Sequence, residues 1–271
     1  MRRARTIAGV RAALEPLRSG SIGLVPTMGA LHAGHVALME AARRECDTVV
    51  ASIFVNPAQF DDPADLEAYR IDTEADAATA EAAGVDLLFV PTQEEMYPEG
   101  FQTWVDVEKL SRGLEGDRRP GHFRAVATIC AKLFTIVRPD RAYFGEKDAQ
   151  QAAVIDRLVR DLALELEVRV IPTVRDRDGL ALSSRNARLS AEERAAAGAI
   201  PRALSAGKLA YRRGEDPVAA TRTALADEPL LEPEYVEVAR LDGSAPLLTA
   251  AVRAGATRLI DNVVLEGAKD E

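Results

Sequence analysis

One stretch decides the fold of this chain: Gly23-Leu24-Val25-Pro26-Thr27-Met28-Gly29-Ala30-Leu31-His32-Ala33-Gly34-His35. The apolar residues 22–25 predict a buried strand, and Pro26, which has no backbone N–H, is expected to end that strand. Gly29 and Gly34 allow the backbone to turn tightly. From Ala33 onward the apolar residues recur at helical spacing. The stretch therefore predicts a strand that passes directly into a helix.

Two of the three histidines in the chain, His32 and His35, lie at this junction. The first N–H groups of a helix lack partners within the helix and carry the positive end of its dipole, so they attract phosphate. Ligands of open parallel sheets also collect at the carboxyl ends of the strands. We therefore expect both imidazoles to donate to phosphate oxygens. A capping or core histidine is the alternative, and the flanking glycines favour the functional interpretation.

The composition is that of a globular protein, with 47% hydrophobic and 28% charged residues in 271. No apolar run approaches the roughly 20 residues that cross a bilayer, and no apolar segment follows the basic N-terminus as in a signal peptide. Cys46 and Cys130 are too few for a disulfide framework and match no metal spacing. These features predict a cytoplasmic protein without a membrane partner.

The net charge of −9 argues against broad nucleic-acid binding. It does not exclude an anionic substrate, because local arginine clusters can form a positive pocket on an acidic protein. Arg118 and Arg119 form one such cluster, and Arg175 and Arg177 form another.

Strands and helices alternate through the first two thirds of the chain. Strands are expected at 48–55, 86–90, 141–144 and 166–174, and helices at 6–17, 65–83, 123–137 and 149–162. Residues 103–107 are expected to form a half-exposed strand near an edge, and residues 113–121 a mobile loop. The alternation predicts an α/β fold with a doubly wound parallel sheet, Rossmann-like.

The pattern changes after Val174, where we place a domain boundary. Beyond it we expect helices from 190 to about 213 and from 217 to 226, and strands at 235–239 and 257–265. The sequence thus predicts a larger domain, 1–174, and a smaller mixed α+β domain, 175–271.

Polar residues follow several of these strands. Asn56 and Gln59 offer amide donors and acceptors suited to hydroxyl and carboxylate groups, although an Asn-Pro turn with exposed amides is equally compatible. Lys147 follows a short strand and is placed to act as a point charge on phosphate. Gln151 lies one turn into the next helix. The sequence predicts that Lys147 and Gln151 face the same crevice.

A second candidate phosphate site is Ser183-Ser184-Arg185. Two hydroxyls and a guanidinium can hold a polyphosphate through several donors. Taken alone, however, the segment is better explained as an ordinary helix cap.

Together these motifs resemble the pantoate–β-alanine ligases, within the wider His-x-Gly-His nucleotidylyltransferase group. The resemblance rests on Pro26-Thr27-Met28-Gly29-Ala30-Leu31-His32-Ala33-Gly34-His35, Phe54-Val55-Asn56-Pro57-Ala58-Gln59-Phe60, Pro120-Gly121-His122-Phe123-Arg124, Arg138-Pro139-Asp140-Arg141-Ala142-Tyr143-Phe144-Gly145-Glu146-Lys147-Asp148, Asp178-Gly179-Leu180-Ala181-Leu182-Ser183-Ser184-Arg185-Asn186 and Thr257-Arg258-Leu259-Ile260-Asp261-Asn262. The motifs occur in family order and span nearly the whole chain.

The resemblance implies a cytoplasmic enzyme that joins pantoate to β-alanine through a pantoyl adenylate, using ATP with Mg²⁺ and no dedicated metal residue. It also implies a homodimer and a C-terminal domain that closes over ATP. The implied ATP-binding residues are Met28, Gly29, Ala30, Leu31, His32, Ala33, Gly34, His35, Gly145, Glu146, Lys147, Asp148, Val174, Leu182, Ser183, Ser184 and Arg185. His35 takes the role of proton donor, and His32, Lys147, Ser184 and Arg185 are the other catalytic candidates. Gln59 and Gln151 are implied to hold pantoate, with Gln59 also near β-alanine and Asn56 beside it.

The chain departs from the family pattern at Ala33, Ala125, Ala149 and residues 69–72. These changes remove packing and loop features rather than candidate catalytic groups. Two other interpretations remain: a nucleotidyltransferase that stops at an adenylated product, and a nucleotide-binding protein without catalysis. A plain nucleotidyltransferase does not require both Gln59 and Gln151, and an inactive protein is expected to lack His35, Lys147 or Arg185.

Overall fold

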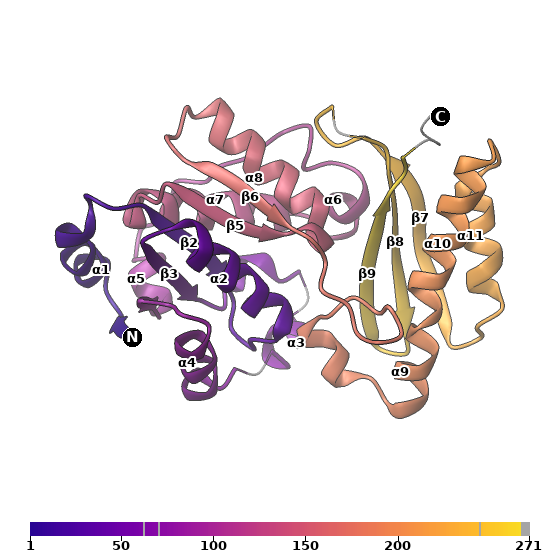
Figure 1. Cartoon of the computed structure of the whole chain (residues 1–271), viewed down its shortest axis with the longest axis horizontal. Coiled ribbons are helices and arrows are strands. Elements are labelled where there is room, and N and C mark those ends of the chain that lie inside the picture. The colour runs from indigo at the N-terminus through magenta and orange to yellow at the C-terminus, as the bar shows by residue number, and fades with distance from the viewer. Residues whose placement is uncertain (62, 70, 244, 267–271) are drawn as a thin grey trace. The chain divides into compact units, whose positions relative to one another are not determined.

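The computed structural model describes residues 1–61, 63–69, 71–243 and 245–266. The chain divides into two compact units (Figure 1). The first contains residues 1–146 and 150–172, and the second contains residues 147–149 and 173–271. The short segment 147–149 thus belongs with the C-terminal residues. The division into a catalytic domain and a lid at residue 174 stays a prediction.

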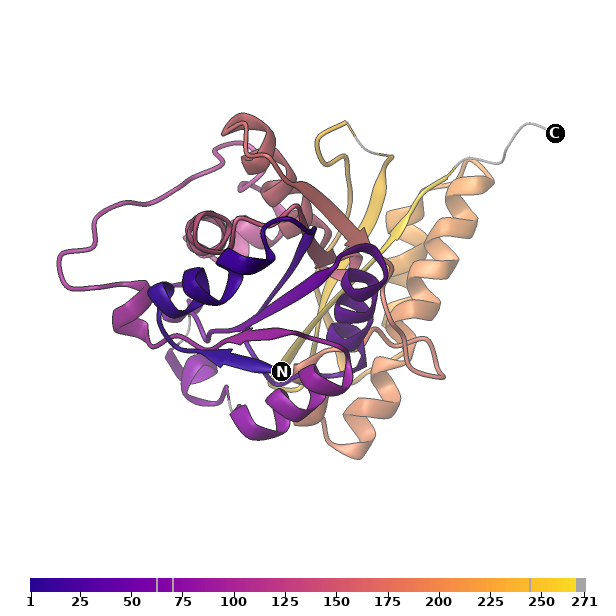
Figure 2. The same ribbon diagram turned by 60° about the vertical axis from the view of Figure 1, so that its left-hand side comes forward.

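A parallel sheet of six strands forms the centre of the first unit (Figure 2). The strands are β1 (Arg2–Ala4), β2 (Ile22–Thr27), β3 (Thr48–Ile53), β4 (Leu87–Phe89), β5 (Arg141–Gly145) and β6 (Glu167–Ile171). Their order across the sheet is β1-β4-β3-β2-β5-β6, and every pairing is parallel. The chain winds one way from β2 to β4 and the other way from β5 to β6. The predicted doubly wound sheet is confirmed.

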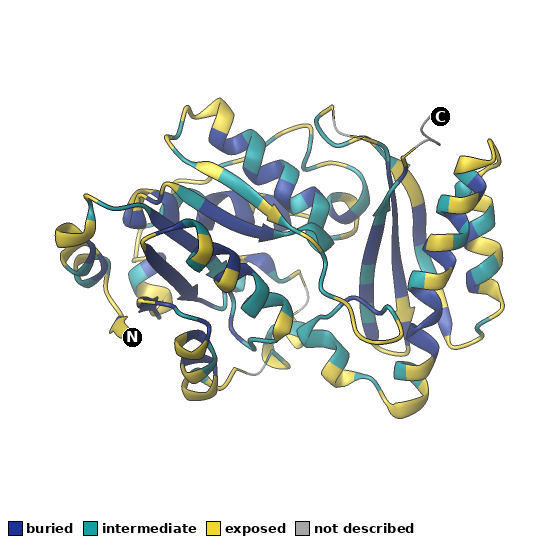
Figure 3. Ribbon diagram, viewed as in Figure 1, coloured by how far each residue is buried: buried dark blue, intermediate teal, exposed yellow. Residues whose placement is uncertain are grey.

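Helices cover both faces of this sheet. They are α1 (Ile7–Leu14), α2 (Ala33–Glu45), α3 (Pro63–Glu67), α4 (Thr73–Ala82), α5 (Gln93–Met96), α6 (Leu114–Arg118), α7 (His122–Val137) and α8 (Ala149–Asp161). Successive strand residues point to opposite faces, so Leu24 packs with α1, α7 and α8, whereas Val25 packs with α2 and α4. Both faces of the central strands are therefore buried, as Figure 3 shows. This explains why their sequences are mostly apolar rather than alternating.

The second unit contains an antiparallel sheet of β7 (Leu231–Ala239), β8 (Leu247–Ala254) and β9 (Thr257–Val264), in that order. Its helices are α9 (Ala191–Ala197), α10 (Ala199–Arg212) and α11 (Pro217–Ala226). Residues from these helices and strands share one hydrophobic core. The predicted mixed α+β character is confirmed, although β8 is not anticipated from the sequence, and a break at Gly198 divides the long helix expected after residue 190.

Several local expectations are wrong. Strand β2 continues through Pro26 to Thr27, because at Pro26 it has a neighbour only in β3, and a strand tolerates a missing N–H where one side is unpaired. The helix expected at 65–83 is two helices, α3 and α4, and Asp72 caps α4 by accepting from the backbone N–H groups of residues 74 and 75. Within the atypical segment 69–72, Arg70 lies outside the described residues.

The third wrong expectation is the edge strand at 103–107, which is not a strand. Its Val105 N–H donates to Thr128 Oγ1 on α7, at 2.9 Å, and Arg124 lies over the Trp104 ring. The segment thus packs on a helix, while β1 occupies the sheet edge beside β4. The segment expected to be a loop at 113–121 contains the short helix α6. The Gln150 side chain of α8 accepts from Glu115 N at 3.1 Å, which holds α6 to α8.

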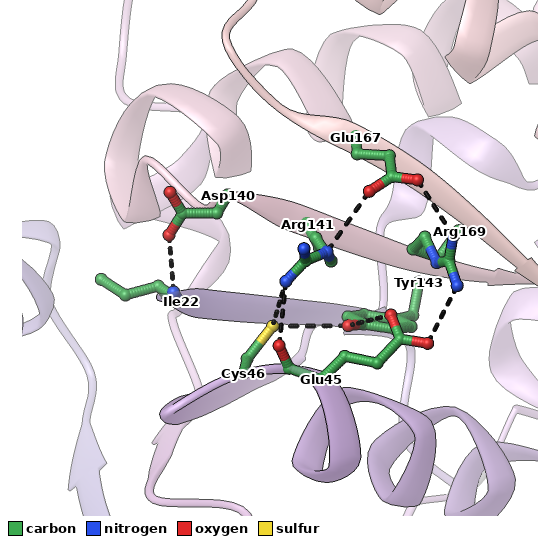
Figure 4. Close-up of polar contacts among 8 residues, drawn as sticks. All are labelled: Ile22, Glu45, Cys46, Asp140, Arg141, Tyr143, Glu167 and Arg169. Carbon is green, nitrogen blue, oxygen red and sulfur yellow. Dashed lines mark hydrogen bonds and ion pairs between the residues drawn. The ribbon is translucent and has the colours of Figure 1, made fainter. Parts of the chain in front are cut away.

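A cluster of charged side chains joins α2 to the amino-terminal ends of β5 and β6 (Figure 4). The Glu45 carboxylate accepts from Arg169 at 3.0 Å and from the Tyr143 hydroxyl at 3.1 Å. Arg141 donates to the Glu45 carbonyl at 2.9 Å and to the Glu167 carboxylate at 3.3 Å. The C-terminal end of α2 is thereby fixed to the sheet, on the side opposite the strand ends that carry the candidate site.

None of the helices in the described ranges has both the length and the apolar composition needed to pass through a bilayer.

Candidate active site

The junction of β2 and α2 is organised by the two histidines that the sequence singles out. His32 is the N-cap of α2, and its Nδ1 accepts from Gly34 N at 3.1 Å. In return, Nδ1 of His35 accepts from His32 N at 3.3 Å. The two rings lie with their centroids 4.2 Å apart. Each histidine thus takes part in the cap and faces its neighbour, so the capping interpretation is confirmed, while the functional interpretation stays a prediction.

These hydrogen bonds assign the tautomer of both rings. A ring nitrogen that accepts from a backbone N–H carries no proton, so in the neutral ring the proton lies on Nε2. Each neutral imidazole therefore uses Nδ1 for the cap and carries its proton on Nε2. Both side chains are half-buried. The pair is suited to donate to oxygens of an anionic ligand.

The backbone N–H groups of the turn are largely engaged within the protein. Gly29 N donates to Thr27 Oγ1 at 3.2 Å, and the N–H groups of residues 30 and 31 donate to the Asp76 carboxylate. His35 N and the following N–H donate to the His32 carbonyl. The sequence suggests that the first N–H groups of α2 attract phosphate, whereas these particular donors are already paired. Side-chain donors are thus the better candidates for phosphate contacts.

Asn56 and Gln59 lie immediately after β3, around a short 3₁₀ turn, Pro57–Gln59. Both side chains are buried, so the alternative of an Asn-Pro turn with exposed amides is wrong. Asn56 Nδ2 donates to Gln59 Oε1 at 2.9 Å. The Gln59 carbonyl accepts from Arg119 at 3.0 Å and from Nδ1 of His122 at 3.0 Å. The third histidine therefore positions the Gln59 backbone, a role that the sequence indicates only through the Pro120-Gly121-His122-Phe123-Arg124 motif.

The carboxyl ends of β3, β2 and β5 are neighbours in the sheet. They carry the 56–59 turn, the histidine turn and Gly145, so the fold brings these predicted site segments together. Strands β2 and β5 pair only through Gly23 and Leu24, whereas β2 pairs with β3 over its whole length. In the sheet, the boundary between β2 and β5 is also where the strands wound in one direction meet those wound in the other. This is the position where open α/β sheets bind ligands.

Gln151, the second predicted substrate residue, is half-buried on α8 in the first unit. Its neighbour Gln150 is buried and donates to the carbonyls of Leu110, Arg112 and Gly113 at 3.0–3.2 Å. Of the two adjacent glutamines, Gln150 thus has a structural role in holding the segment that leads into α6.

The second unit contains the remaining candidates. Lys147 Nζ lies 3.4 Å from the Asp148 carboxylate, and the Lys147 carbonyl accepts from Asn262 of β9 at 2.9 Å. Next to Asn262, the buried Asp261 carboxylate accepts hydrogen bonds from two guanidinium nitrogens of Arg175, at 2.7 and 2.9 Å. The Lys147 backbone is therefore held by β9, a connection not anticipated from the sequence.

Val174 and Leu182 are brought together by a backbone hydrogen bond of 3.0 Å from Leu182 N to the Val174 carbonyl. Ser183 then caps the 3₁₀ turn Ser184–Arg188 by accepting from Arg185 N at 3.2 Å. The capping interpretation is thus confirmed for Ser183. Ser184 and Arg185 lie within the capped turn, where the hydroxyl and guanidinium remain the candidates for polyphosphate.

The described residues contain no group of three or more His, Cys, Asp or Glu side chains placed to hold a metal ion. A metal that enters with a phosphate ligand needs few protein ligands.

The comparisons with known proteins agree with this architecture. The family model for pantoate–beta-alanine ligase matches residues 2–264. The chain belongs to this family. It is 52% identical to the pantothenate synthetase of Acidobacterium capsulatum, over 98% of this chain and 97% of the relative.

Solved structures of pantoate–beta-alanine ligases share the fold. The pantothenate synthetase of Thermus thermophilus matches with a TM-score of 0.93 and 48% identity, covering 98% of this chain and 99% of the other. The ligase of Francisella tularensis, complexed with beta-gamma ATP and beta-alanine, matches with a TM-score of 0.86 and 33% identity, covering 99% of both. Family membership thus extends over both units of the chain.

Proposed function

We propose that this chain condenses pantoate with β-alanine in an ATP-dependent reaction that passes through pantoyl adenylate and releases pyrophosphate and AMP. The observation that carries the proposal is the histidine pair at the carboxyl end of β2, with both Nδ1 atoms engaged in the cap, in a chain of the pantoate–β-alanine ligase family. Two imidazoles beside the switch point of a parallel sheet suit an adenylation reaction.

In the first step, a carboxylate oxygen of pantoate attacks the α-phosphorus of ATP, and pyrophosphate leaves. Such phosphoryl chemistry needs positioning and charge stabilisation more than covalent help. In this proposal, side-chain donors stabilise the negative charge that develops on the phosphate oxygens, and His35 is the proton donor. The donors are those of His32, His35, Lys147, Ser184 and Arg185. Val174 and Leu182, joined through their backbones, complete the proposed nucleotide site.

In the second step, the amine of β-alanine attacks the acyl carbon, the acyl–phosphate bond breaks, and AMP leaves. We assign Gln59 and Gln151 to pantoate, with Gln59 also near β-alanine. The Asn56–Gln59 hydrogen bond and the anchored Gln59 carbonyl support this assignment, because they fix a buried carboxamide in one orientation. No side chain is assigned as the base that takes the amine proton.

We further propose that Mg²⁺ enters with the phosphates of ATP, that the enzyme is a cytoplasmic homodimer, and that residues 175–271 act as a lid. The resemblance supports all three. Light scattering of the purified chain tests the dimer, and the Mg²⁺ dependence of turnover tests the metal. A monomer at working concentration, or full turnover in excess chelator, would remove the corresponding part of the proposal.

The deciding experiment follows pyrophosphate release from Mg²⁺-ATP with pantoate, in the presence and absence of β-alanine, together with AMP and pantothenate. We expect release to depend on pantoate, and AMP and pantothenate to accumulate only with β-alanine. Pyrophosphate release without amide formation would indicate an adenylyltransferase with another acceptor. ATP binding without turnover would indicate a binding protein.

A further inference from the structure

The turn between β2 and α2 has an unusual backbone. Gly29 has a φ of +82° and Ala30 a φ of +52°, so two successive residues adopt the left-handed region. An alanine is disfavoured there, because its Cβ crowds the following carbonyl. The surrounding structure must therefore hold Ala30 in place.

A carboxylate from a distant helix supplies that hold. Asp76 on α4 is 5% exposed, and its Oδ2 accepts from Ala30 N at 2.8 Å while its Oδ1 accepts from Leu31 N at 2.7 Å. Hydrogen bonds to an ionised acceptor are shorter and stronger than neutral ones. Both acceptor atoms of one buried carboxylate thus bind two consecutive N–H groups of the turn.

The contact is close enough to require glycine at position 29. A Cβ added to Gly29 would lie 2.8 Å from Asp76 Oδ2 and 2.9 Å from Cγ2 of Ile71. Real Cβ atoms do not approach other atoms so closely. The Asp76 carboxylate therefore occupies the space that a side chain at position 29 would need.

We propose that Asp76 is a positioning residue for the nucleotide-binding turn, an inference that rests on the proposed function of that turn. By binding the N–H groups of residues 30 and 31, Asp76 sets the direction in which the chain enters α2. That direction places the His32 cap and, one turn on, His35. Asp76 also withdraws these two N–H groups from any ligand, which leaves the phosphate contacts to side chains.

The test compares Asp76→Asn and Asp76→Ala with a matched control, Asp72→Ala. Asp72 lies on the same helix end and also accepts two backbone N–H groups, at 3.0 and 3.1 Å, but these belong to α4 itself and the side chain is exposed. The control therefore weakens α4 without touching the turn. The carboxamide of Asp76→Asn keeps the volume of the carboxylate and one acceptor, and places an NH₂ group against the other N–H.

For Asp76→Asn we expect kcat/KM for ATP in pantoyl adenylate formation to fall roughly tenfold, and for Asp76→Ala to fall further, because charge-assisted hydrogen bonds are lost. The rate at which β-alanine consumes preformed pantoyl adenylate should stay near that of the wild type. Asp72→Ala, which removes the N-cap acceptor, should lower Tm yet keep kcat/KM for ATP within roughly twofold. If Asp72→Ala reduces adenylation as much as the Asp76 variants do, the effect is helix stability and the proposal fails.

Hydrogen–deuterium exchange of the full chain provides a readout that does not depend on activity. The amides of residues 30 and 31 should exchange faster in Asp76→Asn than in the wild type or in Asp72→Ala. Unchanged exchange would show that Asp76 does not hold the turn. If the wild type releases no pyrophosphate, the proposed function fails, while the exchange result still decides whether Asp76 fixes the turn.

Discussion

The backbone N–H of His32 donates to Nδ1 of His35, at 3.3 Å, so the two histidines of the signature are tied to each other through the helix cap. The Nδ1 of His35 serves the cap, and the proposed function assigns chemistry to Nε2 of the same ring. Substitutions that keep one nitrogen position and lose the other can separate these two roles.

His35→Asn and His35→Ala form such a pair. Asparagine has an acceptor near the position of Nδ1 and nothing at Nε2, whereas alanine has neither. We expect both variants to lose most of the turnover, and only His35→Ala to lose about 1 kcal/mol of unfolding free energy as well, which is typical of a lost cap. Turnover assays and urea unfolding measure the two effects. A His35→Asn protein with near-normal turnover would show that the ring acts only as a cap.

Lys147→Met should lower the rate of pyrophosphate release roughly 100-fold, because the variant lacks the ammonium group that we assign to stabilise the phosphate during the reaction. The effect on unfolding should stay below about 1 kcal/mol, since the ion pair with the half-exposed Asp148 is long and solvated, and the Asn262 contact is to the backbone. Lys132→Met, which removes an ammonium stacked over Phe101, is the control. Equal loss of activity in both variants would point to a general charge effect.

Glu45 should contribute stability that depends on pH. Burial raises the pKa of its carboxyl, but the hydrogen bonds from Arg169 and Tyr143 outweigh burial, so the pKa in the folded state lies below the ordinary value of 4.5. A lowered pKa stabilises the fold above 4.5, and that stability is lost as the pH falls through the folded-state pKa. Glu45→Gln should therefore be less stable than the wild type at pH 7, by about 0.5–1 kcal/mol, and the difference should shrink below pH 4.5.

Urea unfolding at several pH values measures this difference. Glu40→Gln, at an exposed position on the same helix, is the control and should match the wild type throughout. A difference for Glu45→Gln that is constant from pH 7 to acid would contradict the assigned ion pair.

Cys130 should resist thiol reagents in the native protein. Burial raises the pKa of its thiol to about 12, and the thiolate is the nucleophilic form. We expect no alkylation of the Cys130 peptide at pH 8 without denaturant and complete alkylation in urea, both followed by mass spectrometry. Rapid labelling of the native chain at Cys130 would mean that α7 opens far more often than its buried position implies.

The sequence predicts the main elements of the sheet well, because their apolar runs are local signals. Strand β3 is mostly apolar because it is buried on both faces, and α2 shows apolar residues at helical spacing. The edge strand is different. β1 is three residues long and begins Arg-Arg, and it becomes a strand only because β4, more than eighty residues later, pairs with it.

The sequence by itself determined the fold class, the family and the segments that carry the candidate site, since these depend on local pattern and on motifs in order. Only the tertiary structure decided which atoms of those segments are engaged. Asp76 illustrates the reason: nothing in its local sequence distinguishes it from the acidic residues that begin many helices, and its role arises because α4 packs beside a turn that Gly29 keeps open. Hydrogen bonds between residues 45 positions apart depend on packing, which no local pattern encodes.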